Sequence, residues 1–87
     1  MHEATLLKDI MSKLERIADE QAVTRISAVH LRLGALAHIS GAHLREHFEE
    51  ASRGTRAEGA RVDIDEATEI DEPHAQDILL TAVEVPD

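Results

Sequence analysis

Cysteine is absent from this sequence of 87 residues, and aromatic residues are almost absent. Without cysteine the chain can form no disulfide, no Cys-ligated zinc site and no thiol nucleophile. Its composition fits a reducing compartment, and we expect a cytoplasmic protein. Phe48 is the only aromatic residue, so the chain offers no stacking platform for bases or sugars. No apolar run approaches the roughly 20 residues that span a bilayer, and the first residues lack the basic-then-apolar pattern of a signal peptide.

Basic residues are scarce relative to acidic ones, with 9 Lys and Arg against 18 Asp and Glu, for a formal net charge of −9. This charge disfavours nucleic acids and anionic membranes as ligands. It suits a divalent cation or a basic protein surface, although acidity also serves solubility. The sequence has no Gly-rich phosphate loop and no Gly-x-Ser-x-Gly motif, and so small a core can hardly enclose an active site. We therefore expect no enzyme.

Hydrophobic residues make up 43% of the chain, enough for one core and a single domain over residues 1–87. Helical spacing of apolar residues predicts a helix over residues 5–19, with Thr5 as its N-cap. A second helix is expected over residues 42–52, after Ser40 and Gly41. Period-two alternation predicts strands over residues 26–33, 60–65 and 78–85. Residues 67–77 are acidic and predict an exposed loop.

The expected order is therefore helix, strand, helix, strand, strand, which indicates an α+β fold. We expect a small, three-stranded, mostly antiparallel sheet with both helices packed on one face. An exposed edge strand of that sheet could support partner docking or self-association.

The first three residues, Met1, His2 and Glu3, can chelate a metal ion. The donors would be the Met1 amine, the amide nitrogen and imidazole of His2, and either the amide nitrogen or the carboxylate of Glu3. Such nitrogen-rich sites suit nickel(II) or copper(II), and affinity should rise with pH because the amides must lose protons. The alternative is that His2 is an incidental residue at the end of the chain.

Three segments resemble one known family in register. Met-His-Glu followed by an amphipathic helix, residues 26–36 (ISAVHLRLGAL) and residues 53–60 (RGTRAEGA) are similar to the HypA/HybF family of hydrogenase nickel-incorporation proteins. Residues 79–85 are similar to that family's closing strand. The Gly-Thr-x-Ala-Glu-Gly turn combined with Met-His-Glu makes this resemblance fairly specific.

The resemblance implies a nickel metallochaperone that helps insert nickel into nickel–iron hydrogenase, with nickel(II) held by the Met1 amine, His2 and Glu3. It implies a HypB-type GTPase and the hydrogenase large-subunit precursor as partners. Some members of the family serve urease, so the client enzyme stays open. The family normally carries a zinc module with two Cys-x-x-Cys pairs between its last two strands. Here the acidic loop at residues 67–77 takes that place, so we expect no zinc at a cysteine site.

Other histidines are candidates for an auxiliary metal site. His43 and His47 lie one helical turn apart, a spacing that lets two imidazoles share one ion, and His38 lies nearby in the sequence. His74 follows Pro73 in the acidic loop and could bind a cation weakly. The alternative for each is an ordinary solvated residue. His30 alternates to the polar side of its strand and is expected to be structural.

Two further functions compete with nickel delivery. The chain could be an acidic interaction adaptor in hydrogenase or urease assembly that has lost metal delivery together with the zinc module. A small metal-dependent hydrolase using His38, His43 and His47 is the third hypothesis. Nickel binding that depends on His2 would favour the chaperone over both.

Overall fold

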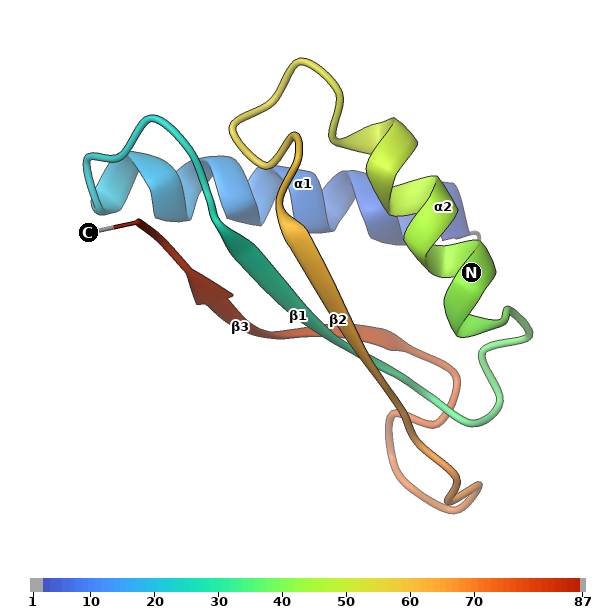
Figure 1. The fold of residues 1–87 in the computed structure, drawn as a ribbon. Helices are drawn as coiled ribbons and strands as arrows, with labels where there is room; N and C mark the ends of the chain where they lie inside the picture. The colour runs from blue at the N-terminus through green and yellow to red at the C-terminus, as the bar shows by residue number, and fades with distance from the viewer. Residues whose placement is uncertain (1–2, 87) are drawn as a thin grey trace.

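The computed structural model describes residues 3–86, with side chains from Thr5 onward. These residues form two helices and three strands in the expected order (Figure 1). The elements are α1 (Glu3–Glu20), β1 (Ala28–Leu33), α2 (Gly41–Ala51), β2 (Arg61–Glu66) and β3 (Ile78–Glu84). Each predicted segment is therefore confirmed to within about two residues at either end, and residues 67–77 contain neither helix nor strand.

Helix α1 is amphipathic, as predicted from its apolar spacing. Leu7, Ile10, Leu14 and Ala18 recur every three or four residues, and all four are buried. The predicted cap was wrong, because the helix already begins at Glu3 and Thr5 lies inside its first turn.

Helix α2 begins after Ser40, whose hydroxyl accepts a hydrogen bond of 3.1 Å from the backbone N–H of His43. This bond satisfies one of the N–H groups that a helix start leaves without a partner. Leu44 and Phe48 face the core and are almost completely buried. Their burial fixes the rotation of α2, and His43 stays exposed while His47 is half-buried.

The sheet is mixed rather than mostly antiparallel, which corrects the sequence-based expectation. Its strand order is β2-β1-β3, so β1 is central and the last two strands are not neighbours. β1 pairs with β3 antiparallel and with β2 parallel. The physical reason is α2, which carries the chain from one end of β1 back to the other, so that β2 runs in the same direction.

Both helices pack on one face of this sheet, as expected. Val29, Leu31 and Leu33 of β1 join residues of α1 and α2, among them Leu14 and Phe48, in a single core. Figure 1 shows α1 crossing behind the strands. The opposite face of the sheet carries polar side chains. Neither helix of the described chain has the length and hydropathy that a membrane crossing requires.

The loop at residues 67–77 is held against the end of β1 by backbone hydrogen bonds. The N–H of Ala67 donates to the carbonyl of Leu33 (2.9 Å), and the N–H of Leu36 donates to the carbonyl of Ala75 (2.7 Å). Gly34 donates its N–H to Asp77 (2.9 Å). The connection from β2 to β3 is thus short and pinned at both of its ends.

Candidate metal-binding residues

The expected nickel ligands lie at the start of the chain. Met1 and His2 fall outside the described residues, and Glu3 is described only as the first residue of α1. The described part of the chain thus begins with a helix whose first turn is already formed. The N–H groups of a helix's first turn have no intrahelical acceptor, so the amide nitrogen of Glu3 is not committed to helix bonding.

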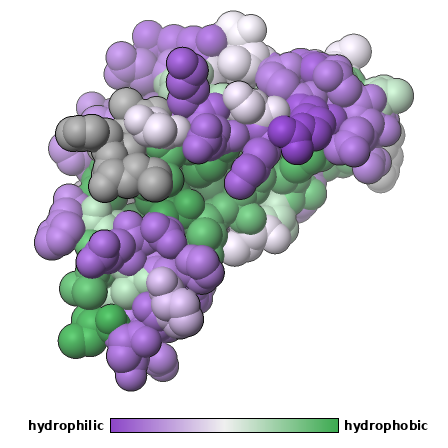
Figure 2. Space-filling view, turned by 180° about the vertical axis from the view of Figure 1, so that it is seen from behind, coloured by the Kyte–Doolittle hydropathy of each residue, from purple (hydrophilic) through white to green (hydrophobic). Residues whose placement is uncertain are grey.

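The first turns of α1 lie beside α2 and form one side of a groove. The groove has a volume of about 460 Å³ and is lined by Leu7, Lys8, Met11, His47, Glu50 and Ala51. Leu7 follows Glu3 by one helical turn, so this groove lies close to the start of α1. Figure 2, which views the molecule from behind, shows an apolar band across the middle of this face, bordered by hydrophilic residues.

His43 and His47 are brought together on α2. Their ring centroids are 4.7 Å apart and the ring planes are inclined by 71°. His43 is exposed, and His47 is half-buried in the groove against α1. His38 does not lie on α2: it occupies the connection from β1, where its φ is +60° and its side chain is exposed. Across the described residues, no three histidine, cysteine or acidic side chains come together to hold a metal ion.

His74 pairs with one carboxylate of its own loop. Its Nδ1 lies 2.9 Å from Oδ2 of Asp77. Glu72 of the same loop instead accepts a hydrogen bond of 2.6 Å from Arg32 on β1. The two carboxylates near His74 therefore contact different residues. The pair of His74 and Asp77 holds the loop together locally.

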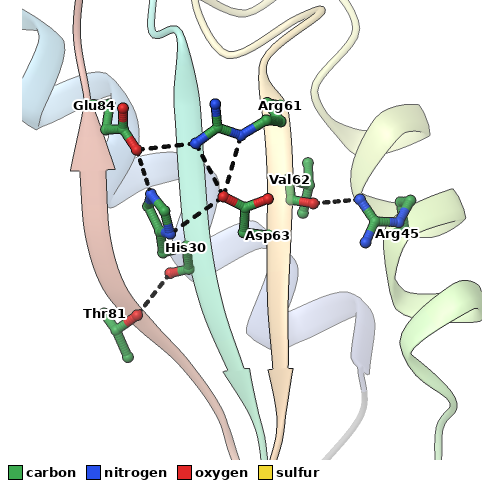
Figure 3. Close-up of polar contacts among 7 residues, drawn as sticks. All are labelled: His30, Arg45, Arg61, Val62, Asp63, Thr81 and Glu84. Atoms are coloured by element: carbon green, nitrogen blue, oxygen red, sulfur yellow. Dashed lines mark hydrogen bonds and ion pairs between the residues drawn. The ribbon is translucent and has the colours of Figure 1, made fainter.

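The polar face of the sheet contains a charge network that spans all three strands (Figure 3). Nε2 of His30 lies 2.6 Å from a carboxylate oxygen of Glu84, and its Nδ1 lies 3.5 Å from Asp63. Arg61 joins both carboxylates at 3.0 and 3.1 Å. The hydrogen bond with His30 lowers the pKa of Glu84, and the charge of Arg61 acts in the same direction. His30 thus has the structural role expected for it.

Arg45 connects α2 to β2 at the edge of the sheet. Its guanidinium donates a hydrogen bond to the carbonyl of Val62, an outward-facing group of β2 (Figure 3). These pairs were not identified from the sequence. The alternation of Arg61, Asp63 and Asp65 along β2 indicates such pairs, because Asp63 lies opposite His30 and Asp65 opposite Arg32 on β1.

The Gly-Thr-x-Ala-Glu-Gly segment acts as a clamp between α2 and α1. Arg56 donates to the carboxylates of Glu15 (2.9 Å) and Asp19 (2.6 Å) on α1. The backbone N–H of Arg56 also donates to Glu15, and together these bonds lower the pKa of that carboxyl group. Thr55 donates its hydroxyl proton to the carbonyl of Ser52, and Ala57 is buried below the turn. This motif therefore positions α1, the helix that follows the candidate ligands.

Comparison with known proteins supports the resemblance over most of the chain. A family model described as hydrogenase/urease nickel incorporation, metallochaperone, hypA, matches residues 1–71. The match includes Met1 to Glu3 and the Arg56 turn but ends before β3, so the similarity of residues 79–85 to the family's closing strand stays a prediction.

Curated relatives named hydrogenase maturation factor HypA show the same similarity. The protein from Methylocella silvestris is 43% identical over 65 residues, which cover 75% of this chain and 58% of the relative. That from Azotobacter vinelandii is 44% identical over 64 residues, covering 74% and 57%. That from Roseiflexus sp. is 41% identical over 66 residues, covering 76% and 54%. The chain thus spans little more than half the length of the curated relatives it matches.

Proposed function

This chain belongs to the HypA family of nickel-incorporation proteins, and from that membership we propose that it is a nickel metallochaperone for the maturation of nickel–iron hydrogenase. The observation that carries the proposal is the family match over residues 1–71, which includes Met1, His2 and Glu3. Nickel(II) is the cargo of this protein. Its proposed partners are a HypB-type GTPase, which supports delivery, and the hydrogenase large-subunit precursor, which receives the ion in the cytoplasm.

The proposed ligands are the Met1 amine, the imidazole and amide nitrogen of His2, and the amide nitrogen of Glu3. The start of α1 supports this set, because the Glu3 N–H has no acceptor within the helix and can lose its proton without breaking a helical bond. The positive end of a helix dipole disfavours a bare cation. Two deprotonated amides cancel the charge of nickel(II), so the complex as a whole is compatible with that position.

Ligand exchange is the chemistry that a metal carrier needs. A site built from residues that precede a helix leaves the ion open on several sides, so an incoming ligand can attack before the outgoing ones leave. A closed four-ligand site of the structural kind would hold its metal instead. The clamp of Arg56 on Glu15 and Asp19 keeps α1 fixed to the rest of the fold while exchange takes place at its start.

Hydrogenase maturation in cells provides the functional test. A strain that lacks its own HypA-type protein would be supplied with this chain or with His2→Ala, grown in low nickel, and assayed for hydrogenase activity. We expect the unchanged chain to restore activity and His2→Ala to fail, with added nickel restoring the variant. His74→Ala removes another exposed histidine and should behave like the unchanged chain.

One outcome would refute delivery through this site, and another would change only the client enzyme. If His2→Ala matures hydrogenase as well as the unchanged chain in low nickel, the protein acts as an interaction adaptor and not as a carrier. If the maturation of urease, and not that of hydrogenase, depends on the chain, then the client enzyme is urease and the proposed nickel delivery still holds.

A further inference from the structure

Four histidines of the described chain, His30, His43, His47 and His74, differ in their contacts. His30 and His74 each lie within 2.9 Å of a carboxylate, which holds them in place within the sheet face and the loop. His43 and His47 instead turn their rings toward each other on α2, at a centroid distance of 4.7 Å.

The separation of the two rings matches that of imidazoles bound to one ion. With metal–nitrogen bonds of about 2.1 Å and a bond angle between 90° and tetrahedral, two imidazole centroids lie about 4.5–5.2 Å apart. The observed 4.7 Å falls within this interval. The ring planes are inclined by 71°, and His43 is exposed, so its ring can reorient toward an ion shared with His47.

The backbone of α2 holds this spacing before any ion arrives. Ser40 caps the helix, and the burial of Leu44 and Phe48 on its other side fixes its rotation. Residues four apart on a helix lie on the same face, so binding requires little reordering of the chain. Folding therefore already holds the two ligands close together, so metal binding loses little further conformational entropy.

Two acidic residues accompany this pair on α2, and Lys8 of α1 lines the same groove as His47. Glu46 and Glu50 each follow one of the two histidines by three residues, and Glu50 lines the same groove as His47. The chain as a whole has a formal charge of −9, which raises the local concentration of divalent ions. Since the described residues supply no third ligand in place, water would complete the coordination.

We propose that His43 and His47 form a second metal site, a pair of imidazoles on one side of α2 for a divalent late first-row transition metal. Imidazole ligands suit copper, nickel and zinc, and the order of divalent affinities places copper(II) first. The site shares no ligand with Met1, His2 or Glu3. It lies beside the first turns of α1, because His47 and Leu7 line one groove.

The test uses the full chain with the terminal site removed, by His2→Ala together with a Gly-Ser extension before Met1. Copper(II) and nickel(II) would be titrated separately by calorimetry, and the copper complex examined by electron paramagnetic resonance. We expect one copper ion per chain, with coupling to two imidazole nitrogens, and weaker binding of nickel. In the same background, His43→Ala or His47→Ala should weaken binding about tenfold or more, since even the loss of a supporting outer group costs that much.

Two matched variants decide whether metal binding comes from chelation by both imidazoles. Ala42→His combined with His43→Ala keeps two histidines on α2 but places them five residues apart, and it should bind as weakly as His43→Ala alone. His74→Ala removes an exposed histidine elsewhere and should leave affinity unchanged. Circular dichroism confirms that each variant is folded. The proposal is overturned if the shifted pair binds as tightly as the original pair, or if His43→Ala changes affinity less than about twofold. Because the terminal site is absent throughout, neither result bears on nickel delivery.

Discussion

Gly34 lies where the end of β1 meets the loop at residues 67–77. A Cβ atom at this position would lie 2.3 Å from the carbonyl oxygen of Ala75 and 2.6 Å from that of His74. Both are backbone atoms, which cannot turn aside as a flexible side chain can. Gly34→Ala must therefore push residues 74–77 away from β1.

The magnitude follows from three contributions. Gly34 does not have a positive φ, so alanine fits its backbone conformation and would by itself stabilise the protein by about 0.4–1 kcal/mol through the unfolded state. Overpacking costs about 1–3 kcal/mol. Separation of the segments also weakens the bonds from Gly34 to Asp77 and from Leu36 to Ala75, each contributing about 1 kcal/mol. We expect a net loss of about 2–4 kcal/mol in the free energy of unfolding.

Urea denaturation followed by circular dichroism measures this loss. Gly54→Ala is the matched control, because Gly54 has a φ of +80° and a methyl group added there would meet no atom within 4 Å. Its cost should be only the backbone strain of about 1–2 kcal/mol. A Gly34→Ala protein as stable as the unchanged chain, or more stable, would refute the packing of residues 74–77 against β1.

Three further predictions concern the clamp, the polar face and the core. Arg56→Ala should lower the urea midpoint far more than Arg25→Ala, which removes an exposed arginine. The reason is that, among the described residues, Arg56 alone connects the turn to Glu15 and Asp19. Equal midpoints for the two variants would contradict the clamp. The lowered pKa of Glu84 means that its ionised form stabilises the fold above its usual value of 4.5, and that this contribution is lost as pH falls through the lower folded value. Glu84→Gln should therefore flatten the acid side of the stability profile, whereas Glu84 would have no structural role if the profile matched that of the unchanged chain. Phe48→Ala should cost about 3–5 kcal/mol by urea denaturation, while Phe48→Leu stays folded, and a loss below about 1 kcal/mol would contradict the burial of this ring.

Periodicity predicted the helices and strands well because each burial pattern is local. Leu7, Ile10 and Leu14 mark the inner side of α1 without knowledge of any other segment. Strand order is not local, and this is why the mixed sheet was missed. The alternation in residues 61–66 gives the inner face of β2 but not the neighbour with which it pairs.

The candidate site was predictable by resemblance more than by physics. Met1, His2 and Glu3 have chelating potential in any chain, and only the match over residues 1–71 connects them with nickel. The pair of His43 and His47, by contrast, was predictable from helix geometry and not from the resemblance. Helical spacing placed both on one face, and the 4.7 Å between their rings came from the structure. The reach of Arg56 to Glu15 spans 41 residues, and no local pattern indicates it.

Nickel binding by the native amino terminus is the most direct test of the account. Nickel(II) would be titrated near pH 7.5 into the chain with a free Met1 amine, into His2→Ala and into a form with Gly-Ser before Met1, with absorption recorded at each step. We expect a yellow, square-planar nickel complex of one ion per chain that both changes abolish, and whose affinity rises with pH as the amide nitrogens lose their protons. Two imidazoles completed by water, as at His43 and His47, would not give that absorption. An undiminished yellow complex in both altered proteins would contradict the central claim that this chain holds nickel at its first three residues.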